Sequence, residues 1–263
     1  MSRALELSDS ATWWPSVLWQ TTTLELRRDG VRLLVDPGIA PWEVREAAGD
    51  GVDHILLTHG DWDHVMGIGL LADARVWLTQ ASAERIDSGE AAASVRKETR
   101  PYGVPVEGLE GLRWDEQLPL PGELSIGPWA AVCRPSPGHT PDGVTTWLPE
   151  EGLLVVGDYL GEHEIPFIYD SAWNYRATLE MLTEVISRER PRQVVVGHGS
   201  PHNADRALEI AEQDHAYVES LIEFVTGGGT AERAEEVAFP DRGGSDDAGE
   251  HRSNVALAAQ AVA

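Results

Sequence analysis

Residues 58–64 read THGDWDH and carry four possible metal ligands within six consecutive positions. They directly follow VDHILLT, an apolar run with the length of one buried strand. Side chains two positions apart in extended backbone point the same way, so His59 and Asp61 can hold one ion. Asp63 and His64, at the turn into the next helix, can face a second ion. The segment therefore predicts a metal site at the carboxyl end of a buried strand.

Three later segments, PGHT, GD and GHG, each place one more ligand-type side chain just past an expected strand. The residues are His139, Asp158 and His198, which follow strands expected at 130–134, 153–157 and 193–197. Loops positioned by a rigid scaffold are where binding residues gather. Together the four segments supply four His and three Asp. Imidazole and carboxylate ligands suit zinc, iron or manganese.

The rest of the chain predicts strands first and then strands mixed with helices. Residues 17–27 and 31–36 flank Asp29-Gly30 and are typical of a β-hairpin. Residues 171–188 have helical apolar spacing, with Ser171 as the N-cap. Further helices are expected at 42–48, 80–88, 203–225, 230–238 and 252–262, and further strands at 75–79 and 144–148. This order fits a layered α/β sandwich, with one domain over 1–226 and a helical extension over 227–263.

Composition narrows the class of protein. The 263 residues are 42% hydrophobic, enough for a sizeable core, and carry a net charge of −24, which disfavours nucleic acid and anionic membranes as partners. The single cysteine, Cys133, excludes a disulfide scaffold and a cysteine-ligated zinc module, and we expect it in the core. Neither a run of roughly 18 apolar residues nor a signal peptide is evident, so we expect a cytoplasmic protein.

The order THxxxDH, GHT, GD and GHG resembles the metallo-β-lactamase superfamily, nearest in spacing to the glyoxalase II (hydroxyacylglutathione hydrolase) type. The resemblance covers about residues 17–225. It implies a four-layer αββα sandwich with a binuclear site at one edge of the two sheets. It also implies a first metal on His59, Asp61 and His139, a second on Asp63, His64 and His198, and Asp158 as the bridge. The C-terminal helices are similar to those that cover the substrate pocket in this group.

One position departs from the family pattern. The usual motif is HxHxDH, and its second His is Asp61 in this chain. An acidic residue there is similar to the flavodiiron branch, which uses Glu, although the 263 residues contain no flavodoxin-like segment. The resemblance therefore implies two divalent ions, with zinc as the first choice and iron or manganese as alternatives.

The resemblance also implies the chemistry. A metal-bound water has its pKa lowered toward about 7, so hydroxide is available at neutral pH. Asp63 is expected to orient it and accept a proton, and Asp158 to hold both ions. We expect a metal-dependent hydrolase of a small ester, thioester, lactone or related molecule. The alternative is a diiron redox or oxygen-handling protein that needs an external electron donor.

Several further side chains are candidates for contact with a small-molecule substrate. They are Trp62, Tyr159, His163, Tyr169 and Trp173, and Phe167 could also line the pocket; for each aromatic residue core packing is the competing interpretation. His251 is expected at the surface. Neither the substrate nor the oligomeric state follows from the sequence.

Overall fold

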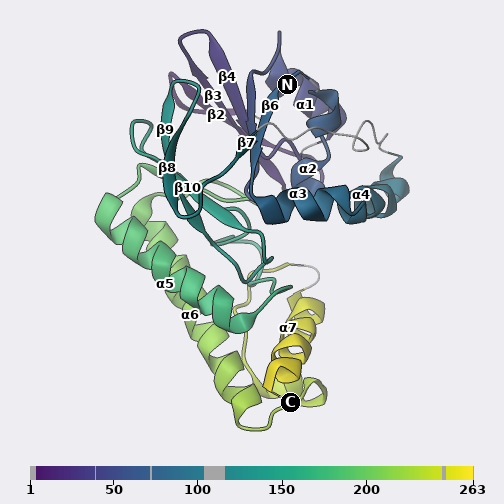
Figure 1. The fold of residues 1–263 in the computed structure, drawn as a ribbon. Coiled ribbons are helices and arrows are strands. Elements are labelled where there is room, and N and C mark those ends of the chain that lie inside the picture. The colour runs from purple at the N-terminus through teal and green to yellow at the C-terminus, as the bar shows by residue number, and fades with distance from the viewer. Residues whose placement is uncertain (1–3, 39, 72, 104–115, 245–246, 263) are drawn as a thin grey trace.

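Two β-sheets face each other, and helices cover the outer face of each (Figure 1). The structure is a computed structural model, and it describes residues 4–38, 40–71, 73–103, 116–244 and 247–262. The arrangement is the α/β metallo-β-lactamase sandwich that the sequence predicts.

The first sheet contains seven strands that follow one another in chain order. They are β1 (Leu5–Ser8), β2 (Ala11–Pro15), β3 (Thr22–Arg28), β4 (Val31–Val35), β5 (His54–Leu56), β6 (Arg75–Leu78) and β7 (Glu116–Gln117). Strands β1 to β4 pair antiparallel and β4 to β7 pair parallel. Strand β5, expected over 52–58, leads into the THGDWDH segment and places it at the carboxyl end of this parallel half.

The hairpin expected around Asp29-Gly30 is confirmed between β3 and β4. Arg28 pairs with Val31, and the two turn residues have φ of 53° and 79°, as a two-residue hairpin turn requires. The strand expected from residue 17 was too long, because β3 begins only at Thr22. Residues 17–21 instead form a loop that reaches the second sheet's end, where the Thr22 amide donates to the Gly197 carbonyl at 2.8 Å.

The second sheet contains five strands in the order β12-β11-β10-β9-β8. They are β8 (Gly122–Ile126), β9 (Trp129–Pro135), β10 (Val144–Leu148), β11 (Leu153–Val155) and β12 (Gln193–Val195). All pairs are antiparallel except β11 with β12, which pair directly in parallel and are connected in the sequence by helix α5 (Ala172–Glu189). The carboxyl ends of these two strands therefore lie next to each other.

Helices fall into two groups along the chain. The outer face of the first sheet carries α1 (Pro41–Ala48), α2 (Trp62–Val65), α3 (Gln80–Asp87) and α4 (Glu90–Thr99), and the second carries α5 (Ala172–Glu189) and α6 (Ala204–Thr226). Short 3-10 turns follow at η1 (Ile68–Leu70), η2 (Arg100–Tyr102) and η3 (Ala231–Glu236). Ser171 caps α5 as expected, since its side chain accepts the Asn174 amide.

Hydrophobic cores join the four layers, one between the two sheets and the others beneath the helices. The core between the sheets includes Leu26, Leu33, Trp129 and Cys133, all at most 1% exposed, so the expectation that Cys133 lies in the core is confirmed. A second core joins the second sheet to α5 and α6, and a third joins the first sheet to its helices. Burial of apolar surface on both faces of each sheet is the main stabilisation of such a sandwich.

The C-terminal extension differs from its prediction in three respects. The helix expected at 230–238 is the 3-10 segment η3, with non-helical backbone at Arg233, and the last helix, α7 (Asp247–Val262), begins earlier than 252. The surface position expected for His251 was wrong, because its imidazole is 3% exposed and contacts the Tyr217 hydroxyl and the Ala234 carbonyl. Among the described residues, no helix is both long enough and apolar enough to cross a membrane.

Candidate metal centre

The seven candidate ligands meet at one edge of the two sheets. His59 to His64 follow β5, His139 lies between β9 and β10, Asp158 follows β11, and His198 follows β12. These positions are far apart in sequence but share the edge where parallel strands end. The structure therefore brings together every residue that the sequence singles out as a metal ligand.

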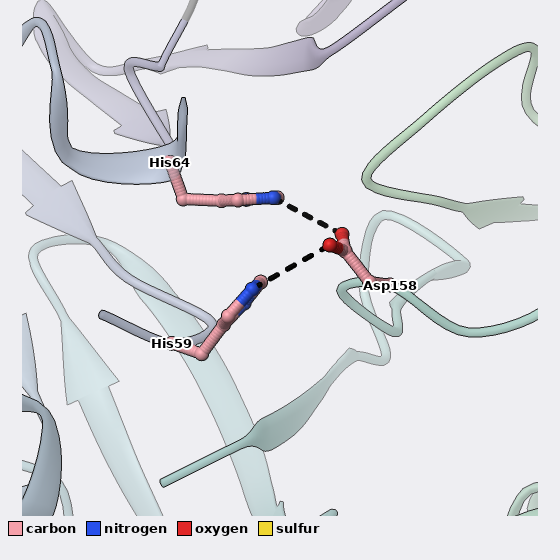
Figure 2. A group of neighbouring side chains, drawn as sticks. All are labelled: His59, His64 and Asp158. Carbon is pink, nitrogen blue, oxygen red and sulfur yellow. Dashed lines mark ion pairs between the residues drawn. The ribbon is translucent and has the colours of Figure 1, made fainter. Parts of the chain in front are cut away.

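Asp158 lies at the middle of the cluster. Its Oδ1 is 3.0 Å from Nε2 of His64, and its Oδ2 is 3.6 Å from Nε2 of His59 (Figure 2). The same Oδ2 is 3.2 Å from Nε2 of His139 and 3.4 Å from Nε2 of His198. One carboxylate thus faces all four imidazoles, as a bridging ligand would.

Two groups of three side chains flank Asp158. In the first, Oδ2 of Asp61 is 3.5 Å from Nε2 of His59 and 3.3 Å from Nε2 of His139. In the second, Nε2 of His198 is 3.2 Å from Oδ2 of Asp63, with His64 beside them. Within each group the possible ligand atoms lie within 4.8 Å of one another. Asp61, although shorter than the family's usual His, reaches the first group.

The Nδ1 atom of each of the four imidazoles forms a hydrogen bond on the side facing away from Asp158. The partners are Thr58 Oγ1 for His59 (3.0 Å), Asp36 Oδ2 for His64 (3.0 Å), the Phe167 carbonyl for His139 (2.7 Å) and the Trp19 carbonyl for His198 (2.8 Å). A metal-binding histidine usually has such a partner on its second nitrogen, which fixes the ring orientation. All four Nε2 atoms are consequently aimed at the centre.

Several of these inward atoms are buried without a hydrogen bond. Among the described residues they include Nε2 of His59, His64 and His139 and Oδ1 of Asp158. Buried polar atoms in folded proteins almost always have a partner, and an unsatisfied group signals an ion or water. Three or more imidazole and carboxylate donors around one point fit a divalent transition metal.

The carboxylates and imidazoles shift one another's protonation. Burial alone would lower the pKa of His139, but the carboxylates of Asp158 and Asp61, 3.2 and 3.3 Å from its Nε2, favour a protonated imidazole and raise that pKa to about 10. Burial alone would raise the pKa of Asp158, but the charges of His64 and His198 hold it well below its usual range. Protons and metal ions therefore compete for the same atoms.

Glycine is required at one point of the site. A Cβ on Gly197 would lie 2.0 Å from Oδ1 of Asp158 and 2.9 Å from Cε1 of His64. No other residue lets the backbone approach the cluster this closely. The first position of the GHG segment is therefore a glycine because a larger side chain would overlap the Asp158 carboxylate.

Asp61 has a second partner outside the cluster. Its Oδ1 accepts a hydrogen bond from Arg85 of α3, and Nη1 of Arg85 donates to Oδ1 of Asp142 at 2.6 Å. Oδ2 of Asp142 in turn accepts the Gly60 amide at 2.7 Å. The sequence did not predict a role for Arg85, Asp142 or Asp36. None of them belongs to a ligand motif, and they lie close to the candidate ligands only in the folded chain.

A cavity of about 470 Å³ opens onto the cluster. Of the expected substrate-contacting residues, Trp62, His163 and Tyr169 line it. Phe167, also a candidate from the sequence, lines it as well. The sequence did not predict the other described residues of the lining outside the ligand candidates, which are Val17, Trp19, Gln20, Glu164, Gly244 and Asp247. Trp19 comes from the loop that the sequence assigns to a strand, and its ring meets that of Trp62 edge-to-face at 4.6 Å.

Tyr159 and Trp173 do not line this cavity. Tyr159 is 2% exposed, and its hydroxyl accepts the His139 amide at 3.0 Å and donates to the Pro137 carbonyl at 2.8 Å. It therefore supports the loop that carries a ligand. Trp173 packs against the core beneath α5 and α6, which is the competing interpretation noted from the sequence.

The sequence matches the protein family that the motifs suggest. Residues 17–198 match the family model of the metallo-beta-lactamase superfamily. The chain is 24% identical over 168 residues to the uncharacterized protein YobT of Bacillus subtilis (strain 168), a match covering 57% of this chain and 69% of YobT.

Two solved structures have the same fold. The B3 metallo-beta-lactamase BLEG-1 is similar with a TM-score of 0.60 and 22% identity, covering 75% of this chain and 95% of that one. The sec-alkylsulfatase Pisa1 from Pseudomonas sp. is similar with a TM-score of 0.79 and 13% identity, covering 99% of this chain and 50% of that one. This chain thus spans half the length of the sulfatase. Because the family match extends over well more than half of the 263 residues, the chain belongs to the metallo-beta-lactamase superfamily.

Proposed function

We propose that this protein is a metal-dependent hydrolase with a binuclear centre. The first ion is held by His59, Asp61 and His139, the second by Asp63, His64 and His198, and Asp158 bridges them. The observation that carries the proposal is the position of the Asp158 carboxylate, within 3.6 Å of Nε2 of four histidines. A lone structural ion would need only one of the two groups.

The chain's own groups have defined parts in such a reaction. Bound divalent ions supply a water of lowered pKa and a Lewis acid for the scissile group. Asp63 accepts a hydrogen bond from the Thr21 hydroxyl at 3.3 Å, which fixes its carboxylate toward the cavity to orient that water and take its proton. The Tyr169 ring lies 5.2 Å from that of His139, and burial raises the pKa of Tyr169. Its hydroxyl stays protonated and can donate to the developing oxyanion.

The substrate in this proposal is a small ester, thioester, lactone or related molecule. A cavity of about 470 Å³ is within the range of small-molecule sites, and its walls include Trp19, Trp62 and Phe167. These rings exclude water from the bond that is cleaved. Catalysis then needs no serine or cysteine nucleophile, and Cys133 is buried away in the core.

Zinc is the first choice of metal, and iron or manganese are the alternatives. The observation that favours iron or manganese is Asp61, because a third carboxylate beside Asp63 and Asp158 makes the ligand set harder than the usual one. A diiron redox protein fed by an external electron donor is therefore the second candidate. The two functions can be distinguished by adding back each metal and measuring whether hydrolysis or oxygen consumption is restored.

The test starts from protein purified without chelators. A panel of small esters, thioesters and lactones should be hydrolysed, the activity should disappear on chelation, and zinc, iron(II) or manganese should restore it. Asp158→Asn should abolish it, whereas Asp205→Asn, at a 76% exposed carboxylate, should not. Full activity in protein shown to be free of metal would contradict the proposal. Restoration by iron alone, with oxygen consumption and no hydrolysis, would favour the second candidate.

A further inference from the structure

The cavity beyond the metal ligands has an unusual lining. Trp19, Trp62, Phe167 and Tyr169 supply aromatic rings, and Glu164 and Asp247 supply two carboxylates that no ligand group uses. The two carboxylates come from separate parts of the chain, one from the segment before α5 and the other from the start of α7. Two carboxylates that line the same cavity repel each other unless a positively charged group lies between them.

Asp247 is buried and only half satisfied. It is 6% exposed, and its Oδ2 accepts the Gly244 amide at 3.1 Å. Its Oδ1 is buried and has no hydrogen-bond partner among the described residues. An unpaired buried carboxylate oxygen is costly, so this atom is available to a group that enters the cavity.

The arginine near Glu164, Arg242, forms its ion pair with another residue, Asp214. Nη1 of Arg242 donates to the Glu164 backbone carbonyl at 2.9 Å, while Nη2 pairs with Asp214 at 2.6 Å. No ion pair reaches the Glu164 carboxylate among the described residues. Burial raises the pKa of Glu164, which means that its negative charge is poorly solvated.

Positive side chains do not balance these carboxylates. In the part of the chain that the structure describes, no lysine or arginine lines the cavity. Arg85 is near but is committed to Asp61 and Asp142. The net charge of −24 adds a field of the same sign around the opening. Apart from the metal ions, a negatively charged substrate group would therefore meet the His163 imidazole and the Tyr169 hydroxyl among the described residues, but no permanently charged cation.

From this lining, and resting on the proposed hydrolase function, we infer that the substrate carries a cationic group. The group, an ammonium or similar cation, lies among the rings of Trp19, Trp62 and Phe167, and Asp247 and Glu164 offset its charge. Aromatic faces attract cations, and desolvated carboxylates gain most from a fixed positive partner. The scissile bond of the same molecule then lies at the metal centre.

The test compares three acetate esters of similar size on the metal-loaded protein. They are acetylcholine, its uncharged carbon isostere dimethylbutyl acetate, and the anionic acetoxypropanesulfonate. The inference predicts that kcat/KM for the cationic ester exceeds that of the isostere by on the order of tenfold, and exceeds the anionic ester by more. Equal values, or a preference for the uncharged or anionic ester, would overturn it.

Variants assign the preference to the two carboxylates. Asp247→Asn and Glu164→Gln should each lower the ratio of cationic to uncharged kcat/KM by about threefold or more, with metal content kept. Matched controls at exposed carboxylates, Asp205→Asn and Glu184→Gln, should leave the ratio unchanged. A ratio that persists in the Asp247→Asn, Glu164→Gln double variant would contradict the assignment.

Failure of the inference and failure of the proposed function give different results. If none of the esters, thioesters and lactones of the panel is hydrolysed although the protein holds its metals, the proposed function is wrong. Calorimetric titration with benzyltrimethylammonium then still decides the inference, because it needs no turnover. Binding that weakens in both carboxylate variants supports the cation site, and no binding to the wild-type protein rejects it.

Discussion

Arg85 on α3 donates a hydrogen bond to the outer oxygen of Asp61, whose inner oxygen lies 3.3 Å from Nε2 of His139. The guanidinium is simultaneously fixed by Asp142 at 2.6 Å, and its side chain is 22% exposed. Asp61 therefore reaches the first metal group with its orientation set and its charge offset. A carboxylate with such a partner replaces the neutral histidine of the family pattern at little change in net charge.

Removing Arg85 should weaken the first metal selectively. Arg85→Met keeps most of the side-chain volume but frees Asp61 to rotate, and loss of a group that orients a ligand typically lowers metal affinity about 10- to 100-fold. Chelator competition on the variant measures this affinity for each ion. Arg188→Met is the control, because this arginine pairs with Glu184 and Glu189 of its own helix. Unchanged affinity at both sites would show that Arg85 has no part in positioning Asp61.

Asp158 should be less replaceable than any ligand of one ion. Asp158→Ala removes the carboxylate that faces both groups, so the variant should retain at most a small fraction of either metal. His139→Ala affects the first group alone, so it should keep about one ion per chain. Metal content by plasma mass spectrometry, with circular dichroism to establish folding, measures both. Equal metal content in the two variants would count against a bridge.

Stability of the metal-free protein should fall with rising pH. The pKa of His139 is about 10 in the folded protein, whereas that of an unfolded histidine is about 6.5. Its contribution is fully present below pH about 6.5 and is lost as the pH rises through about 10, a change of roughly 2 kcal/mol or more. Urea unfolding of chelated protein across this range measures it.

Metal-loaded protein is the control for that pH series. Bound metal requires neutral imidazole, so the loaded protein should not lose stability in this window, and metal affinity should instead fall as the pH drops. Metal-free protein whose stability is flat between pH about 6.5 and about 10 would be incompatible with a protonated His139 held by Asp158 and Asp61.

Asn254 connects α7 to the first metal group. Its Oδ1 accepts the Ile168 amide at 3.0 Å and its Nδ2 donates to the Pro166 carbonyl at 2.6 Å. The residue between them, Phe167, supplies the carbonyl that orients His139. Asn254→Ala should therefore lower first-site metal affinity by about tenfold.

The exposed neighbour of Asn254 provides the control. Ser253→Ala changes a hydroxyl that bonds only within α7, to the Gly249 carbonyl at 3.2 Å, and should leave both metals in place. Chelator competition for each ion compares the two variants. A parallel loss of both metals in Asn254→Ala would point to general destabilisation rather than to the Phe167 carbonyl.

Much of the fold and the cluster could be predicted because the signals are local. Strand β5 is a short apolar run, and the candidate ligands between His59 and His64 follow it closely. His139, Asp158 and His198 each stand beside a glycine just past a strand, and the parallel strand ends fix where they meet. Ligand chemistry and strand order together were sufficient for this part.

The parts that could not be predicted depend on contacts across space. Residues 17–21 begin with an apolar run that favours a strand, but they form a loop whose Gln20 carbonyl accepts the Gly199 amide, more than 170 positions later. That loop brings Trp19 to the cavity and its carbonyl to His198. His251 looks like a surface residue in a polar stretch, yet tertiary packing of α7 on α6 buries it.

Anomalous scattering from crystals grown without chelators tests the central claim most directly, because it locates each metal ion and identifies the element. Two peaks per chain are expected, one among His59, Asp61 and His139 and the other among Asp63, His64 and His198. Both should lie about 2.0–2.2 Å from the ligand atoms, and both should contact Asp158. An active protein whose crystals show no metal at this edge, or a single ion that does not contact Asp158, would contradict the binuclear account.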